Sequence, residues 1–287
     1  MSFIDIPTTT EKSIGKTERG RDWLKSLPDV VALLAEKWDL DLMEPFSDEA
    51  TASWVAPCES PHGRAVLKVG FPHWEADYEI DGLMAWNGGC TVHLIAADKP
   101  RHALLLERCE PGTVLRTQPE SKQDSVIAEL CRELWRTPAP NHIRTLENMI
   151  GRWCDHAERH YAELPQTGEN VDFELAERGL AELQRLANSA IVPKLLATDL
   201  HAGNVLASSR RPWLVIDPKP HVGDACYDLT QHLMNIKPRI ESEGPELIER
   251  LAALADVNAD RLLRWTFGRL CLDPDGLPVA QKLASVL

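Results

Sequence analysis

The chain has 287 residues, 44% of them hydrophobic, which is enough to form a large folded core. A formal net charge of -13 excludes a general nucleic-acid binder, because replacing phosphate counterions needs a basic surface, and it slightly favours a cationic partner. Seven scattered cysteines without a C-x-x-C pair indicate neither a disulfide framework nor a zinc site. With no long apolar run and no secretory signal pattern at its start, we expect a soluble cytoplasmic protein with no membrane partner.

The first third of the sequence predicts a small antiparallel unit. Residues 21–45 carry apolar side chains at helical spacing that is interrupted at Pro28, which indicates a helix or a pair of helices. The runs "TASWVAPCES" and "RAVLKVGF" flank a Pro-Gly turn and predict a hairpin. "HWEADYEIDGLMAW" then predicts a helix with Trp74 and Tyr78 on one face, and "TVHLIAAD" and "HALLLERC" predict two further strands that end near Cys109.

After "EPGTVL" the pattern becomes mainly helical. Three segments, "DSVIAELCRELWR", "HIRTLENMIGRWCDHAERHYAEL" and "DFELAERGLAELQRLANSA", repeat apolar residues every three or four positions, as amphipathic helices do. Two short β-like pieces, "NVLASS" and "WLVIDPK", interrupt the pattern, and helices resume from Tyr227. The tryptophans stand mostly at core spacing, so we expect Trp153 and most of the others to be packed in the interior.

One segment, "KLLATDLHAGNVLASSRRPWLVIDPK", gathers residues suited to phosphate chemistry. Asn204 follows Asp199 by five positions, and Asp217 stands at the end of a β-like run, where a strand holds a carboxylate at a fixed point. Asn204 and Asp217 offer the hard oxygen ligands that Mg²⁺ prefers, and Asp199 could accept a proton from an attacking hydroxyl group. An isolated Asp and Asn at this spacing usually form only a turn, but the later "GDACYDL" makes a composite pattern that favours chemistry.

The composite "TDLHAGNVL…WLVIDPK…GDACYDL" resembles the aminoglycoside phosphotransferase family, and closely its streptomycin and hydroxyurea kinase branch. The resemblance implies an α+β, protein-kinase-like fold in two lobes. A small antiparallel β N-lobe with one helix, preceded by the leading helices, would occupy residues 1–109 and bind the nucleotide. A larger, mainly helical C-lobe, residues 110–287, would hold the catalytic loop, the metal site and the acceptor site.

The resemblance also implies roles for individual residues of this segment. Asp199 corresponds to the catalytic base, and Asn204 and Asp217 correspond to the metal ligands. His201 is implied to support the catalytic loop, and Asp228 to hold that loop from below.

The sequence departs from the family pattern just before the proposed base. Family members commonly read His-Gly-Asp, whereas Ala197 and Thr198 precede Asp199 here. Because the missing histidine is usually architectural, the departure concerns the anchoring of the loop rather than proton transfer.

The first lobe should supply positive charge for the nucleotide phosphates. Lys68 lies inside the apolar run "AVLKVG", where an ammonium group is costly unless it is paired, and the resemblance makes it the phosphate-contacting lysine. Its partner would be Glu79 or Glu75, which lie four residues apart on one helical face; Glu79 fits the family spacing to Leu83 better.

The nucleotide would be held mainly by backbone groups. "HALLLERCEPG" resembles the linker between kinase lobes, so the backbone at Glu107 and Cys109 is implied to hold adenine. No glycine-rich loop is visible, because "FSDEATASWVAPCE" stands at its place without a glycine, and no P-loop exists elsewhere. Cover of the phosphates would therefore rely on serine or backbone groups.

The resemblance implies an ATP- and Mg²⁺-dependent O-phosphotransferase for a small-molecule acceptor, and the expected acceptor is an aminoglycoside or aminocyclitol such as streptomycin. Guanidinium groups of such an acceptor would suit acidic residues from 140–190 and from the helices after Asp217, and His221 and Asp224 are expected near the acceptor. Alternatives are a kinase of hydroxyurea, another antibiotic or a metabolite, and a pseudokinase that binds ATP without transferring it. A protein kinase is disfavoured because D-F-G and A-P-E segments are absent.

Overall fold

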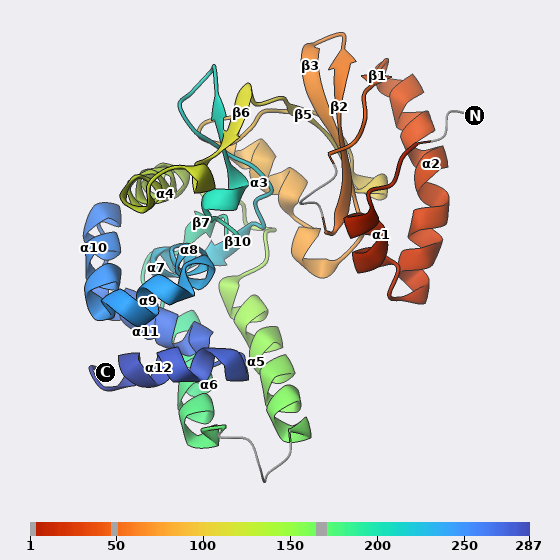
Figure 1. Ribbon diagram of the computed structural model, residues 1–287. Coiled ribbons are helices and arrows are strands. Elements are labelled where there is room, and N and C mark those ends of the chain that lie inside the picture. The colour runs from red at the N-terminus through yellow and green to blue at the C-terminus, as the bar shows by residue number, and fades with distance from the viewer. Residues whose placement is uncertain (1–3, 47–50, 165–170) are drawn as a thin grey trace.

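The computed structural model describes residues 4–46, 51–164 and 171–287. An antiparallel sheet with its helices forms a small lobe, and a mainly helical lobe lies beside it (Figure 1). The helices are α1 (Thr8–Ile14), α2 (Glu18–Trp38), α3 (Glu79–Trp86), α4 (Glu120–Leu134), α5 (Leu146–Glu163), α6 (Phe173–Ala187), α7 (Ala225–Asp228), α8 (Thr230–Asn235), α9 (Lys237–Glu243), α10 (Pro245–Ala255), α11 (Ala259–Leu270) and α12 (Leu277–Ala284). The strands are β1 (Asp41–Leu42), β2 (Ser53–Ser60), β3 (Gly63–Gly70), β4 (Leu94–Asp98), β5 (Ala103–Glu107), β6 (Pro111–Val114), β7 (Lys194–Leu196), β8 (Val205–Ser208), β9 (Leu214–Val215) and β10 (His221–Gly223).

The five-stranded sheet of the small lobe has the order β1-β2-β3-β5-β4 with antiparallel neighbours. The predicted hairpin and the two following strands are confirmed. β3 is the central strand, and its alternate residues face opposite sides of the sheet. Leu67 and Val69 pack into the core under α2, whereas Val66 packs with α3 on the other face. Lys68 therefore points to the α3 side, toward the helical lobe.

Helix α2 runs through Pro28 without a break, so of the two predicted alternatives the single helix is confirmed. A proline inside a helix removes one backbone hydrogen bond and costs about 3 kcal/mol. That cost is offset because Leu27, Val31 and Leu34, at most 1% exposed, form a continuous apolar stripe against the sheet. The helix ends instead at Asp39, whose backbone is left-handed at φ 53°.

The helix predicted across residues 73–86 is shorter than expected. It begins only at Glu79, and Trp74–Ala76 form a single 3-10 turn. Arg144 explains the break, because its guanidinium lies 5.1 Å from the Trp74 ring centroid and donates a hydrogen bond of 2.7 Å to the Trp74 carbonyl. That carbonyl is thereby held by the helical lobe, and Trp74 does not share a helix with Tyr78.

The helical lobe contains the three amphipathic helices that the sequence predicted, α4, α5 and α6. α6 and α11 pack closely at two glycines: a Cβ atom on Gly179 would lie 2.2 Å from Cys271 Cβ, and one on Gly268 would lie 2.6 Å from Leu183 Cγ. Within the described ranges, no helix has both the length and the hydropathy to cross a membrane.

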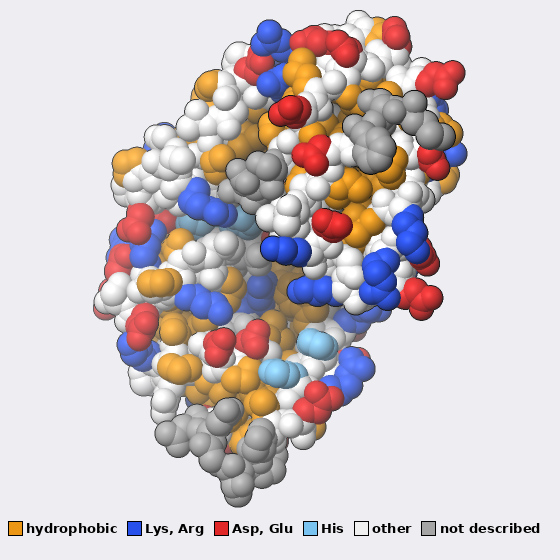
Figure 2. All heavy atoms as spheres, turned by 45° about the vertical axis from the view of Figure 1, so that its right-hand side comes forward, with side chains coloured by type: hydrophobic (Ala, Val, Ile, Leu, Met, Phe, Trp, Pro, Cys, Tyr) orange, Lys and Arg blue, Asp and Glu red, His pale blue; other side chains and the backbone are white. Residues whose placement is uncertain are grey.

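Two small sheets bring the predicted functional segments together. β7, just before Asp199, pairs with β10, which follows Asp217. β8, just after Asn204, pairs with β6 and with β9, which precedes Asp217. The segments that carry these three residues therefore lie side by side. The face shown in Figure 2 is hollowed between the two lobes, and charged side chains surround the hollow. β6, β7 and β10, which periodicity did not indicate, have only three or four residues each.

Replacement of Leu67 by alanine tests how strongly α2 and the sheet depend on their shared core. Leu67 is 0% exposed, so we expect the free energy of unfolding to fall by about 2–5 kcal/mol. Urea unfolding followed by circular dichroism measures the change, and Met84→Ala, at a side chain 61% exposed, is the control. Equal losses in the two variants would contradict this description of the core.

Candidate active site

An ion-pair cluster around the buried Lys68 connects the sheet to the helical lobe. Lys68 Nζ lies 2.6 and 2.8 Å from the two carboxylate oxygens of Glu79 and 2.5 Å from Asp217 Oδ1. Burial by itself would lower the pKa of Lys68, but the Asp217 and Glu79 carboxylates outweigh it and raise the pKa above its usual value. Lys68 is therefore charged at neutral pH, and its partner on α3 is Glu79 rather than Glu75.

The loop that carries Asp199 is anchored from below by a buried carboxylate. Asp228, 0% exposed, accepts hydrogen bonds from the backbone N–H groups of Ala197 (3.1 Å) and Thr198 (2.7 Å) and from Trp135 Nε1 (3.0 Å). Burial raises the pKa of Asp228 to about 6. The loop thus has a firm anchor although the family's usual histidine is absent.

Thr198 adopts an unusual backbone conformation in this loop. Its φ of 49° is left-handed, which is rare for a β-branched residue and needs support from its surroundings. The Thr198 hydroxyl supplies part of this support by donating to the Lys219 carbonyl at 2.5 Å. In the other direction, the Lys219 N–H donates to the Ala197 carbonyl at 2.8 Å, so the segments on either side of Asp199 and Asp217 are fastened together.

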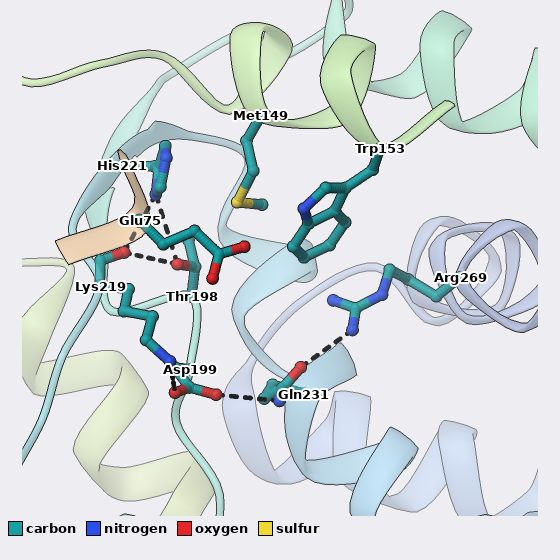
Figure 3. Close-up of a pocket in the computed structure, with 9 residues that line it drawn as sticks. All are labelled: Glu75, Met149, Trp153, Thr198, Asp199, Lys219, His221, Gln231 and Arg269. Atoms are coloured by element: carbon teal, nitrogen blue, oxygen red, sulfur yellow. Dashed lines mark hydrogen bonds and ion pairs between the residues drawn. The ribbon is translucent and has the colours of Figure 1, made fainter. Parts of the chain in front are cut away.

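Both carboxylate oxygens of Asp199 are occupied. Lys219 Nζ lies 2.5 Å from Oδ2, and Gln231 Nε2 donates to Oδ1 at 2.9 Å (Figure 3). Gln231 is held in turn by Arg269, which donates to its Oε1 at 2.9 Å and lies 4.7 Å from the Trp153 ring centroid. The residues Lys219, Gln231 and Arg269 were not identified from the sequence.

A cavity of about 230 Å³ opens beside Asp199. Its lining residues come from distant parts of the chain: Glu75, Met149, Trp153, Thr198, Asp199, Lys219, His221, Gln231 and Arg269 (Figure 3). Trp153 packs against the core of the helical lobe, as expected, and its half-buried ring also lines the cavity. The spacing of four residues between Met149 and Trp153 on α5 was the one sequence signal for this wall.

The acidic lining also differs from expectation. The helices after Asp217 and the 140–190 region contribute Met149, Trp153, Gln231 and Arg269, without an acidic group. Glu75 provides the carboxylate instead, from the 3-10 turn before α3, and it points into the cavity (Figure 3). Among the described residues, it has no hydrogen-bond or ion-pair partner.

His221 and Asp224 lie on different sides of the chain that follows Asp217. His221 lines the cavity, and burial lowers its pKa to about 4, so its ring is neutral at pH 7. Asp224 does not line the cavity: it caps α7, pairs with Arg261 and accepts a hydrogen bond of 2.7 Å from Trp265 Nε1. The expected acceptor-side position of Asp224 is therefore wrong, because its carboxylate is used to join α7 to α11.

Oxygen atoms suited to a metal ion lie near the Lys68 cluster. Asn204 donates from Nδ2 to the Asp199 carbonyl at 3.0 Å, which leaves its Oδ1 without a partner in the described chain. The Asp217 side chain is 43% exposed, and Lys68 occupies only its Oδ1. The Ile216 N–H donates to the Asn204 carbonyl at 2.9 Å, so the two residues lie on neighbouring segments.

These oxygens fit Mg²⁺ shared with phosphate, because Mg²⁺ is usually held by one or two carboxylates together with phosphate oxygens and water. The described residues contain no group of three or more His, Cys, Asp or Glu side chains that could hold a metal alone. His201 accepts a hydrogen bond from the Gly203 N–H at 3.0 Å, a contact that supports the turn before Asn204.

The segment between the lobes is fastened by an arginine. Glu107, at the end of β5, accepts hydrogen bonds from Arg210 at 2.9 Å and from the His93 N–H at 3.0 Å. Arg210 also donates to the carbonyls of Gly88 (2.6 Å) and Thr91 (2.8 Å). Two residues on, the Cys109 N–H has no hydrogen-bond partner in the described ranges, so it is free for a ligand.

Comparison with known proteins agrees with this geometry. A sequence model of the family described as "Aminoglycoside/hydroxyurea antibiotic resistance kinase" matches residues 43–274. Streptomycin 6-kinase of Streptomyces glaucescens is 29% identical over 98% of this chain and 97% of its own length. Hydroxyurea phosphotransferase of Kitasatospora aureofaciens is 31% identical over 88% of this chain and 73% of its own.

A solved structure shares the fold. A thermostable mutant of the aminoglycoside phosphotransferase APH(4)-Ia, crystallised with ADP and hygromycin B, superposes with a TM-score of 0.56. The match covers 89% of this chain and 96% of that one at 17% identity. The two-lobed, kinase-like arrangement expected from the sequence is therefore confirmed.

The variant Asp228→Asn tests the anchor beneath the Asp199 loop. An amide keeps one acceptor oxygen for three buried donors, and each unsatisfied donor costs about 1–3 kcal/mol. We expect thermal and urea unfolding to show a loss in this range. Asp155→Asn, at an exposed position on α5, is the matched control. If Asp228→Asn is as stable as that control, the carboxylate does not anchor the loop.

Proposed function

Because the chain belongs to the aminoglycoside/hydroxyurea antibiotic resistance kinase family, we propose that it transfers the γ-phosphoryl group of ATP to a hydroxyl group of a small cationic acceptor, an aminocyclitol such as streptomycin. One observation carries the proposal most directly. Asp199 lies at the cavity, on a loop fastened to the segment of Asp217, whose carboxylate contacts Lys68. A base for the acceptor and a cation for the nucleotide thus belong to one connected site.

In this proposal the residues of the small lobe bind the nucleotide. Lys68, fixed by Glu79, contacts the phosphates, and the backbone at Glu107 and Cys109 holds adenine. Bound Mg²⁺ would neutralise charge on the phosphate oxygens, and Asn204 and Asp217 would hold it. The nucleotide lobe would comprise residues 1–109, and residues 110–287 would carry the catalytic loop and the acceptor site.

Asp199 acts on the acceptor. Its carboxylate orients the hydroxyl group and takes its proton as the oxygen attacks the γ-phosphorus in line. His201 keeps the turn between Asp199 and Asn204 in place through its contact with the Gly203 N–H. The base thereby approaches the acceptor from a rigid loop, which favours catalysis by positioning.

The cavity favours a cationic acceptor at one wall. The unpaired Glu75 carboxylate faces Met149 and Trp153 across the cavity, an arrangement that suits a guanidinium or ammonium group (Figure 3). A volume of about 230 Å³ is below that of most drug-sized pockets, roughly 300–1,000 Å³, so one ring of an aminocyclitol would enter. Hydroxyurea would fit entirely and is the second candidate acceptor.

Removal of the proposed base is the direct test. General-base catalysis contributes about 10²–10⁴-fold, so we expect Asp199→Ala to lose turnover by that factor while nucleotide affinity changes little. A coupled ADP-release assay with Mg²⁺, ATP and streptomycin measures turnover, and calorimetry with ADP measures binding. Asp155→Ala is the control. Undiminished acceptor-dependent turnover by Asp199→Ala would remove Asp199 from the mechanism, and ADP binding by a wild-type protein that turns over no acceptor would favour a pseudokinase.

Glu75→Gln tests the preference for a cationic acceptor. A hydrogen bond to a charged group contributes about 1.5–3 kcal/mol, which corresponds to an increase of about 10–100-fold in the KM for streptomycin. The KM for uncharged hydroxyurea should not change, so the second acceptor is an internal control. Equal effects on both acceptors, or none on streptomycin, would show that Glu75 does not select for charge.

A further inference from the structure

Lys219 has a fixed backbone and a side chain that can move. Its N–H donates to the Ala197 carbonyl at 2.8 Å, and its carbonyl accepts from the Thr198 hydroxyl at 2.5 Å. Those contacts lock its Cα beside the Asp199 loop. Among the described residues, its Nζ makes one ion pair, at 2.5 Å from Asp199 Oδ2, and lysine stems turn readily about their bonds.

The acceptor hydroxyl must displace one of the two groups that occupy the Asp199 carboxylate. Gln231, on Oδ1, is held by Arg269, and Arg269 is itself held at 2.5 Å from the Tyr227 hydroxyl. Moving Gln231 would disturb this buried chain of contacts. Moving Lys219 from Oδ2 disturbs one ion pair, so Lys219 is the group that we expect the acceptor hydroxyl to displace.

The yielding ammonium group needs a new anion, because an unpaired charge in a partly buried site is costly. The Glu75 and Asp217 carboxylates also attract Lys219, but in the proposed function they bind the cationic acceptor and Mg²⁺. The remaining anion is the transferred group, because negative charge spreads over its equatorial oxygens between acceptor and leaving group. Two other cations of the site are already engaged: Lys68 by Glu79 and Asp217, and Arg269 by Gln231 and Tyr227.

We propose that Lys219 is a further catalytic residue, whose ammonium group leaves Asp199 when the substrates bind and donates hydrogen bonds to the transferring phosphoryl group. The inference rests on the proposed function. In the step, the acceptor oxygen forms a bond to the γ-phosphorus and the bond from that phosphorus to the β,γ-bridging oxygen breaks. Its electron pair leaves with ADP, the hydroxyl proton passes to Asp199, and Lys219 remains protonated throughout.

The sequence adds an independent reason for such a cation. The segment from Met43 to His62, where kinases place a glycine-rich loop, contains no glycine. Glycine allows a backbone to approach phosphate closely and present its N–H groups. Because this segment has no glycine, we expect another residue to supply positive charge to the phosphates. Lys219 does so from the side of the helical lobe, opposite Lys68.

The test compares Lys219→Met with Lys219→Arg, and uses Lys282→Met, an exposed lysine that pairs with Glu241, as the matched control. Calorimetry in the presence of streptomycin measures the affinity for ADP and Mg²⁺ with and without aluminium fluoride, which mimics the transferring phosphoryl group. A second assay measures streptomycin-dependent ADP release. Thermal unfolding of each variant without ligand verifies that it is folded.

If Lys219 contacts the transferring group, fluoride strengthens ADP binding in the wild type, and Lys219→Met loses most of that gain while keeping its affinity for ADP alone. Turnover falls by about 10²–10³-fold, as on removal of one donor to a transition-state oxyanion. Lys219→Arg, which keeps the charge, recovers part of both.

Two results distinguish a failure of the proposed function from a failure of the role proposed for Lys219. A wild-type protein without any fluoride-dependent gain and without acceptor-dependent turnover would overturn the proposed function itself. A wild-type gain that Lys219→Met retains in full, even with slower turnover, would overturn the role of Lys219 and leave it as a group that only positions Asp199.

Discussion

The charge of Lys68 is the constraint on which the rest of the site depends. An ammonium group 8% exposed on the central strand of a sheet is stable only beside carboxylates, and breaking such a buried pair costs about 3–5 kcal/mol. Two carboxylates supply these contacts: Glu79, which lies on α3, and Asp217, which lies in the helical lobe. The position of α3, the end of β9 and the approach of the two lobes therefore all follow from one side chain.

The second determinant is a loop that would not hold its shape alone. Thr198 and Asp217 both have a left-handed backbone, at φ of 49° and 50°, on segments that lie side by side. Such conformations persist where contacts determine them several times over, and they concentrate at functional sites. Here the Asp228 carboxylate and the paired backbones around Lys219 do this.

Much of this arrangement could be read from the sequence because it depends on local pattern. Alternation revealed the strands around Lys68, helical spacing revealed α4 to α6, and the fixed intervals between Asp199, Asn204 and Asp217 marked the loop. Such intervals are visible because the residues share one short segment, whose turn and strand place them within a few ångströms.

What the sequence did not reveal depends on contacts between distant segments. Pro28 left a helix and a pair of helices equally open because its cost is local, whereas the stripe that offsets it is buried against another element. Arg269 lies 38 residues from Gln231, and nothing in its own helix distinguishes it from an ordinary surface arginine. Asp224 was misread for the opposite reason: its nearness in sequence to Asp217 suggested a shared task, but a capped helix turns it toward α11.

The arginine between β8 and β9 also limits how the two lobes can move. Arg210 lies in the β8–β9 hairpin of the helical lobe. It donates hydrogen bonds to the Glu107 carboxylate and to the carbonyls of Gly88 and Thr91, which follow α3. Separation at this edge would break several hydrogen bonds together, and separation on the other side would break the contact of Lys68 with Asp217 and the contacts of Arg144 with Trp74 and Asp77. The two lobes are thus fastened on both sides of the Lys68 cluster, so a change in their relative position would have to break both sets of contacts.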